Sequence, residues 1–358
     1  IWAGGVGVPA GPSSMSNVID YVTIATAGNA TDFGDTADLA YYGAQGASSP
    51  TRGIWSGGSP SEDMIQYVTI ASTGNANEFG NLSANRKAPC EASSSTRCVI
   101  VGGYTPTVLN TMEYITIATT GNASDFGDLT FAGSYIAGTS NSVRAVWTGR
   151  YSAPASTNTI EYTEIQTLGN AQDFGDLIAA KGQVASCASR TRGLISGGTP
   201  SAVDTIQHVT IASTGNAIDA ANLTNGRRAH TSFSNQTRGI VAAGGNDPSA
   251  LATIDYVTIS SLADAQDYGD LSETKGYVGS YAISTRGLIA GGQTPTKVNT
   301  IEYVTIATTS NTTDFGDLTV GRRFLQGVGN STRGIFGLSL IHISEPTRLL
   351  SSADSRLG

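Results

Sequence analysis

Seven arginines recur at intervals of about 47 residues, and cations repeated in this way could either bind an anionic ligand or tie the units of a fold together. Each lies in a motif that most often reads Ser-Thr-Arg-Gly. The seven are Arg52, Arg97, Arg144, Arg192, Arg238, Arg286 and Arg333. A residue present in every unit usually meets a need that every unit has. We therefore predict a structural role for the series, and a binding site built from converging cations is the alternative.

Acidic residues supply possible partners for these arginines. An acid stands directly before a repeated tyrosine in five units, as Asp20, Glu113, Glu161, Asp255 and Glu302. A guanidinium binds a carboxylate through two parallel hydrogen bonds, and it also binds backbone carbonyl groups. We expect each repeated arginine either to pair with such an acid or to bond turn carbonyls between units.

Short acidic segments also recur, for example Asp125 to Leu129 and Asp314 to Leu318. They resemble the oxygen clusters that hold Ca²⁺. A calcium site needs about six to eight oxygen ligands, whereas a turn of this kind offers two carboxylates. Asp and Gly more often serve hydrogen bonding within the turn, so we predict no metal site.

Other residues that carry chemistry are sparse. The three cysteines lack CxxC spacing, which predicts neither a disulfide framework nor a zinc site. The three histidines are His208, His230 and His342, and His208 stands at a repeated tyrosine position. The sequence has no nucleophile elbow, phosphate-binding loop or HExxH motif. We predict no catalytic residue, no cofactor and no enzymatic activity.

The repeat itself predicts the fold. Each unit offers four β-segments: a small-residue stretch before the arginine, an apolar run closed by glycines such as 54–58, an alternating segment such as 300–307, and the acidic segment. Four short antiparallel strands in a unit of this length form a propeller blade. We predict an all-β, seven-bladed β-propeller over residues 1–337. The small-residue stretch is expected innermost and the acidic segment outermost.

The ring is expected to close by pairing strands from the two ends of the chain, which hides both sheet edges. The chain begins inside a glycine-closed strand, so the first unit lacks an inner strand. We expect residues 324–331 to supply it by pairing with Ile1, Trp2 and Ala3. Ile335 and Phe336 repeat the register of Ile1 and Trp2, and are then expected to have no blade to join.

The unit resembles the kelch repeat through its double glycine Gly102-Gly103, the later Tyr114, the aromatic Phe126 and the paired arginines 322–323. The resemblance covers residues 1 to about 336 and implies a propeller. Phe stands where kelch repeats usually have Trp, and the spacing from Tyr to this aromatic is longer. The phrase 303–309 with 314–318 resembles repeats in predicted structural proteins of marine bacteriophages and related metagenomic sequences, which implies a virion or extracellular setting.

Residues 338–358 match no unit. Residues 338–348 resemble the conceptual translation of a sequencing-library adapter, so we predict that this segment is an artefact of sequence assembly. A natural tail or linker is the alternative.

The net charge of the chain disfavours some classes of binding partner. The formal net charge is −8, and binding to nucleic-acid phosphates or to an anionic membrane needs a basic surface. No apolar run approaches the roughly 18 residues of a membrane span. We predict a protein or a glycan as partner, with no nucleic acid and no membrane insertion.

The loops that follow the glycine pairs differ from unit to unit. They join the same pair of strands in each blade and so share one face, and unlike loops on a rigid scaffold are typical of a binding surface. The residues expected to make contacts are Tyr104, Tyr151, Asn246, Asp247 and Gln293. The leading hypothesis is a non-enzymatic recognition module. The alternatives are a hydrolase or lyase with acidic residues at the channel mouth, an architectural spacer, and neutral drift of the loops.

Overall fold

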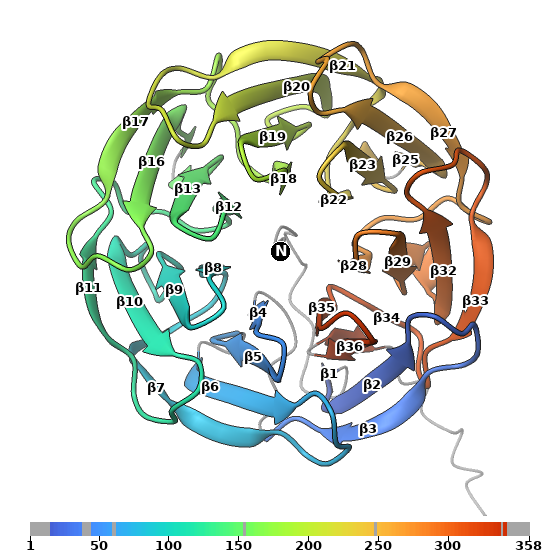
Figure 1. Cartoon of the computed structure of the whole chain (residues 1–358), viewed down its shortest axis with the longest axis horizontal. Coiled ribbons are helices and arrows are strands. Elements are labelled where there is room, and N and C mark those ends of the chain that lie inside the picture. The colour runs from blue at the N-terminus through green and yellow to red at the C-terminus, as the bar shows by residue number, and fades with distance from the viewer. Residues whose placement is uncertain are drawn as a thin grey trace, which may run out of the picture.

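Seven four-stranded antiparallel sheets stand around a central channel in the computed structural model (Figure 1). This is the predicted seven-bladed β-propeller. The structure describes residues 15–37, 44–58, 62–152, 155–246, 249–337 and 339–341. Every regular element in these ranges is a strand, and they contain no helix long and apolar enough to cross a membrane.

Each blade places its four strands in the same order from the channel outward. The inner strands are β35 (Gln326–Gly329), β4 (Gln45–Ser48), β8 (Cys90–Ser93), β12 (Ala137–Ser140), β18 (Ala185–Ala188), β22 (Thr231–Ser234) and β28 (Gly279–Ala282). The second strands are β36 (Arg333–Gly337), β5 (Arg52–Ser56), β9 (Arg97–Val101), β13 (Arg144–Thr148), β19 (Arg192–Ser196), β23 (Arg238–Ala242) and β29 (Arg286–Ala290).

The third and outer strands complete the blades. The third strands are β2 (Val18–Thr23), β6 (Glu62–Thr69), β10 (Thr111–Thr116), β16 (Thr159–Glu164), β20 (Val203–Thr210), β26 (Thr253–Thr258) and β32 (Thr300–Thr305). The outer strands are β3 (Thr31–Asp35), β7 (Asn77–Arg86), β11 (Ser124–Asp128), β17 (Gln172–Asp176), β21 (Ile218–Arg227), β27 (Gln266–Asp270) and β33 (Thr313–Asp317). The predicted inner and outer positions are confirmed.

Crowding explains why the inner strands consist of small residues. A Cβ atom added at Gly46 would lie 2.7 Å from the Cγ1 atom of Val328 in the neighbouring blade. A Cβ added at Gly138 would lie 2.9 Å from Cys90 Sγ. Larger side chains at these positions would force adjacent inner strands apart.

The hydrophobic core lies between blades. One cluster joins Val99 and Phe126 of one blade to Trp147 and Ile165 of the next, and all four side chains are buried. Trp55 is buried in the corresponding way against Ile335 of the closing blade. Each blade therefore depends on its neighbours for burial of its apolar faces.

The ring closes through strands from both ends of the chain, but not through the strand that the sequence suggested. Strand β36 pairs with β2, so that Ile335 lies opposite Tyr21 and Phe336 opposite Asp20. Strand β35 pairs with β36. The expectation that Ile335 and Phe336 would have no blade was wrong, and residues 1–3 lie outside the described ranges.

Chain connectivity explains this correction. Strands β35 and β36 are joined by a turn of three residues, so their pairing closes only a short loop and costs little entropy. The C-terminal hairpin therefore keeps the pairing that each other unit makes between its inner and second strands.

Shorter strands lie at the ends of the blades. Three two-stranded hairpins follow glycine-closed strands: β14 (Tyr151–Ser152) with β15 (Ala155–Ser156), β24 (Gly245–Asn246) with β25 (Ser249–Ala250), and β30 (Gln293–Thr294) with β31 (Thr296–Lys297). A small sheet joins β1 (Met15–Ser16), β37 (Ser339–Ile341) and β34 (Arg322–Arg323). Three residues of the predicted non-repeat segment thus pair with the propeller.

Candidate functional site

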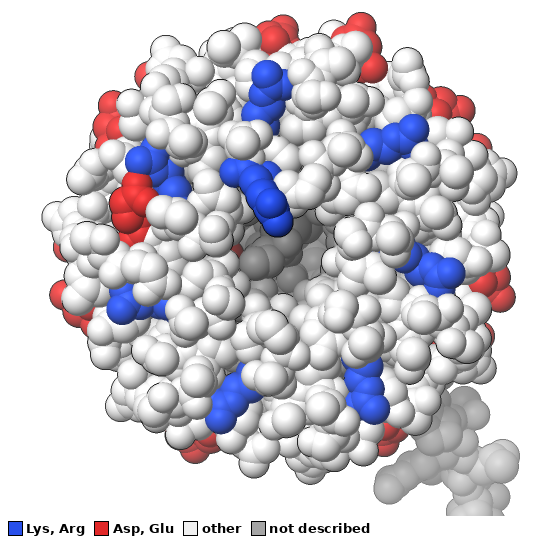
Figure 2. Space-filling model, in the orientation of Figure 1, with Lys and Arg blue, Asp and Glu red and all other residues white. Residues whose placement is uncertain are grey.

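The repeated arginines bind neighbouring blades to one another. Each lies at the start of a second strand, on the face of the ring that we call the arginine face (Figure 2). Each donates from Nη1 to the carbonyl oxygen of the isoleucine that follows the third strand of the next blade, for example from Arg52 to Ile117 at 2.8 Å. The seven acceptors are Ile117, Ile165, Ile211, Ile259, Ile306, Ile24 and Ile70. The bonds run around the whole ring.

Six of these guanidinium groups also cover the ring of a repeated tyrosine. Arg238 Cζ lies 4.6 Å from the centroid of Tyr256, and the tyrosine in turn packs edge-on against Tyr268 at 6.1 Å. The seventh arginine, Arg192, meets His208 in place of a tyrosine. Burial and then the charge of Arg192 lower the pKa of His208, so the neutral imidazole is favoured there.

Of the two roles expected for the repeated arginines, the hydrogen bonds to carbonyls between units are present, and the pairing with the acids before the tyrosines is not. Those acids bind other buried cations, because consecutive side chains of a strand point to opposite faces of the sheet and the arginines cover the tyrosine face. The pairs are Arg322 with Asp20, Arg86 with Glu113, Arg150 with Glu161, Arg227 with Asp255, and Lys275 with Glu302. Of the repeated series, Arg144 makes an ion pair within the described residues, with Glu164.

A second ring of interblade hydrogen bonds uses the acid position itself. Its side-chain oxygen accepts the backbone N–H directly after the acidic segment of the preceding blade, for example from Ser83 to Glu113 at 2.8 Å. Two units have glutamine instead, and Gln207 still accepts the N–H of Ile178 at 2.8 Å. The seven side chains are Asp20, Gln66, Glu113, Glu161, Gln207, Asp255 and Glu302. All seven units therefore make this hydrogen bond, whether the side chain is a charged carboxylate or a neutral amide.

A third ring lies at the outer rim. The N–H of Asp128 donates to Asn170 Oδ1 of the next blade at 3.0 Å, and Asp125 Oδ1 accepts the N–H of Gly127 at 3.1 Å. The equivalent interblade bond is present in all seven units. The aspartates of the acidic segments thus serve turn and interblade bonding. Within the described residues, no three or more His, Cys, Asp or Glu side chains form a group that could hold a metal ion.

The predicted contact residues occupy the opposite face, which we call the glycine face because the glycine-closed strands end there. Tyr104 is 36% exposed, with Lys87 Nζ 5.0 Å from its ring centroid. Gln293 donates to the Pro295 carbonyl at 2.7 Å and accepts from Arg323. Tyr151 and Asn246 begin and end hairpin strands β14 and β24, and Asp247 lies outside the described residues. The structure places the four on four different blades.

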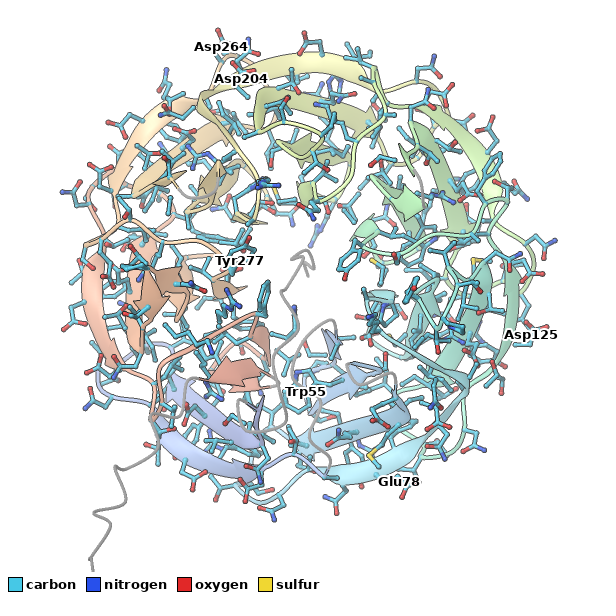
Figure 3. All side chains as sticks on the ribbon, turned by 180° about the vertical axis from the view of Figure 1, so that it is seen from behind. Trp55, Glu78, Asp125, Asp204, Asp264 and Tyr277 are labelled. Carbon is cyan, nitrogen blue, oxygen red and sulfur yellow. The ribbon has the colours of Figure 1, made fainter. Side chains whose placement is uncertain are left out.

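The mouth of the channel on the glycine face holds a feature that the sequence did not reveal. Among the described residues there, six that are not glycine adopt left-handed backbone conformations, each just before an inner strand: Ala88, Tyr135, Gln183, Ala229, Tyr277 and Phe324. Such conformations cost about 1 kcal/mol or more each. Tyr277 lies beside the central opening (Figure 3), and its ring centroid is 4.6 Å from that of Phe324. The varied side chains at this position concealed the shared backbone geometry.

The channel itself is lined mainly by glycine, alanine, serine and threonine of the inner strands, around a cavity of about 320 Å³. Glu91 is the one acid among the described lining residues. Its carboxylate is buried, where it accepts from Ser56 Oγ and lies 3.7 Å from Cys98 Sγ. Burial raises the pKa of Glu91 to about 7. A second carboxylate does not join it in the described part of this cavity.

A serine and a histidine meet between two blades. Ser196 Oγ lies 3.0 Å from His230 Nε2, the distance expected for a nucleophile and its base. Both side chains are buried, and burial lowers the pKa of His230 to about 3. Because no substrate can reach a pair enclosed in this way, it serves as an interblade contact.

Comparison with known proteins adds no family to this description. No protein-family model matches the chain, and no curated protein is significantly similar to it in sequence.

Proposed function

We propose that this protein is a non-enzymatic recognition propeller that holds a protein or a glycan on its glycine face. One observation carries the proposal. The residues common to all units are engaged in the three interblade rings, whereas the loops of the glycine face carry residues without counterparts in the other units. Rigid scaffolds with unlike loops on one face are commonly used for binding.

Tyr104 is the strongest single contact candidate. Its ring is partly exposed, and the bridges that its backbone makes with Lys87 and Val108 fix the loop. An aromatic ring held in this way stacks on a sugar face or packs into a protein pocket at little entropic cost. The three short hairpins extend the same face on other blades.

The hydrolase or lyase alternative requires two carboxylates that converge in one pocket. Glu91 is the only acid that lines the described part of the channel. Its hydrogen bonds with Ser56 and Cys98 hold it within the interface between blades. This geometry favours recognition over hydrolysis. The likeness of the repeat phrase to bacteriophage structural proteins supports a virion or extracellular setting for the binding.

The test compares Tyr104→Ala, Tyr104→Phe and the unaltered chain on a glycan array and in pull-downs from host-cell lysates. We expect Tyr104→Ala to weaken binding about tenfold and Tyr104→Phe to keep most of it. The control is Leu168→Ala, which removes a side chain that is 53% exposed on the arginine face. No saturable binding by the folded, unaltered ring would leave the architectural spacer as the better account.

A further inference from the structure

The arginine face is basic although the chain as a whole is acidic. Its turns carry the seven repeated arginines and Arg190 (Figure 2). Near the described turns of this face, Glu164 pairs with Arg144, and Asp264 accepts the N–H of Asn222 at 2.9 Å. An exposed acid is also the second residue of each outer strand, for example Asp125, and these acids lie at the rim (Figure 2). An anion approaching the centre of this face therefore meets positive charge.

Arg190 differs from the repeated arginines. It stands two residues before Arg192, where the other units have proline, serine or glutamine: Pro50, Ser95, Ser142, Gln236, Ser284 and Ser331. Its side chain is exposed, and it makes no ion pair with any described acid. The repeated guanidinium groups each donate to an interblade carbonyl, whereas the Arg190 side chain makes no hydrogen bond with any described residue.

The backbone of Arg190 is held from both sides. Its N–H donates to Gln236 Oε1 of the next blade at 3.0 Å, and its carbonyl accepts from Asn141 Nδ2 of the preceding blade at 3.3 Å. These bonds hold the Arg190 backbone in place. A binding residue on an ordered backbone loses less conformational entropy on binding than one on a flexible loop.

Arg190 lies at a shallow pocket at the mouth of the channel, and Figure 2 shows a basic side chain reaching over this opening. The other lining residues are small or polar: Ser48, Ser93, Ser94, Ser95, Ser140, Asn141, Ser142, Ala188, Ser189 and Gln236. Ser95 and Ser142 are exposed. The pocket thus offers one guanidinium beside many hydroxyl and amide groups, with Ala188 as its one apolar side chain.

We propose that this pocket binds a carboxylate-bearing monosaccharide unit of the hexuronate class. The guanidinium fork matches one carboxylate through two hydrogen bonds. The exposed Ser95 and Ser142 hydroxyls can donate to and accept from the several hydroxyl groups of such a sugar, and the amide nitrogen of Gln236 can donate to them. The lack of aromatic or large apolar side chains among the described lining residues disfavours an apolar ligand.

The test is titration calorimetry of the full chain with D-glucuronate, D-glucose, acetate and inorganic sulfate. We expect saturable binding of glucuronate, and binding at least about tenfold weaker for glucose, which lacks the charge, and for acetate, which lacks the hydroxyl groups. Equal affinity for acetate or sulfate would overturn the saccharide assignment in favour of a general anion site. No binding of glucuronate would overturn the site itself.

Variants locate the binding. Arg190→Gln is expected to weaken glucuronate binding at least about tenfold, and Arg190→Lys to retain the charge but lose part of the affinity. Lys87→Gln removes the same charge from the glycine face and is the matched control. Equal weakening by Lys87→Gln and Arg190→Gln would overturn the assignment. Because Tyr104 lies on the other face, these outcomes are independent of the recognition function proposed above.

Discussion

Replacing Arg238 by alanine removes two contacts. One is the interblade hydrogen bond from Nη1 to the Ile306 carbonyl at 3.0 Å, and the other is the stacking of the guanidinium over Tyr256 at 4.6 Å. A charged hydrogen bond is worth about 1.5 to 3 kcal/mol, and a partly exposed cation–π contact about 0.5 to 1 kcal/mol. We expect a loss of roughly 2 to 4 kcal/mol in the free energy of unfolding.

Calorimetry or circular dichroism provides the measurement. If the ring unfolds as one unit, a loss of about 2 to 4 kcal/mol lowers the melting temperature by roughly 3 to 6 °C, from the unfolding entropy typical of a chain of this size. The control is Arg190→Ala, which removes the same side-chain type from the same face without an interblade side-chain bond. Equal melting temperatures for the two variants would refute the structural role of the repeated arginines.

Of three further predictions, two concern buried ionisable groups and one concerns a glycine at the rim. Arg227→Met is expected to lower the free energy of unfolding by about 3 to 5 kcal/mol, measured in denaturant, because it leaves the buried carboxylate of Asp255 unpaired. Adding Asp255→Asn to the same chain should restore part of this loss. Burial raises the pKa of Glu91 above its unfolded value to about 7. The folded state therefore binds the extra proton between about pH 4.5 and 7, and stability falls as pH rises through this window. Glu91→Gln should abolish that part of the pH dependence of the melting temperature, and an unchanged profile would contradict it. Gly127→Ala is expected to lower the free energy of unfolding by more than about 1 kcal/mol, since the φ of Gly127 is +139° and an added Cβ would lie 2.5 Å from the carbonyl carbon of Gly169. The control is Gly28→Ala, because nothing lies within 4 Å of a Cβ added there.

Periodicity made most of the fold predictable. The repeat predicted the number of blades and the strand order, because the crowded axis accepts mainly small residues and charged segments are stable at the solvated rim. The closing strand was not predictable from register alone, since Ile1 and Ile335 occupy equivalent positions. The hairpin geometry that favours Ile335 depends on which segments are adjacent in the chain.

The candidate sites could be predicted less well from the sequence than the fold. The cations that pair with the buried acids lie at different distances along the chain. Arg150 follows second strand β13, whereas Arg227 ends outer strand β21 and Arg322 begins β34. Arg190 was hidden beside the repeated Arg192, because a second arginine in the motif looks like a local variation. Its exposure and its place at the channel mouth emerge only when the blades are assembled.

The most direct test of the division between scaffold and binding residues measures binding and melting temperature together for Tyr104→Ala and Arg238→Ala. The assay is glycan-array and pull-down binding at a temperature at which both variants remain folded. We predict that Tyr104→Ala loses binding with a nearly unchanged melting temperature, and that Arg238→Ala melts earlier but binds as the unaltered chain does. The reverse pattern, with binding lost in folded Arg238→Ala and kept in Tyr104→Ala, would contradict the account.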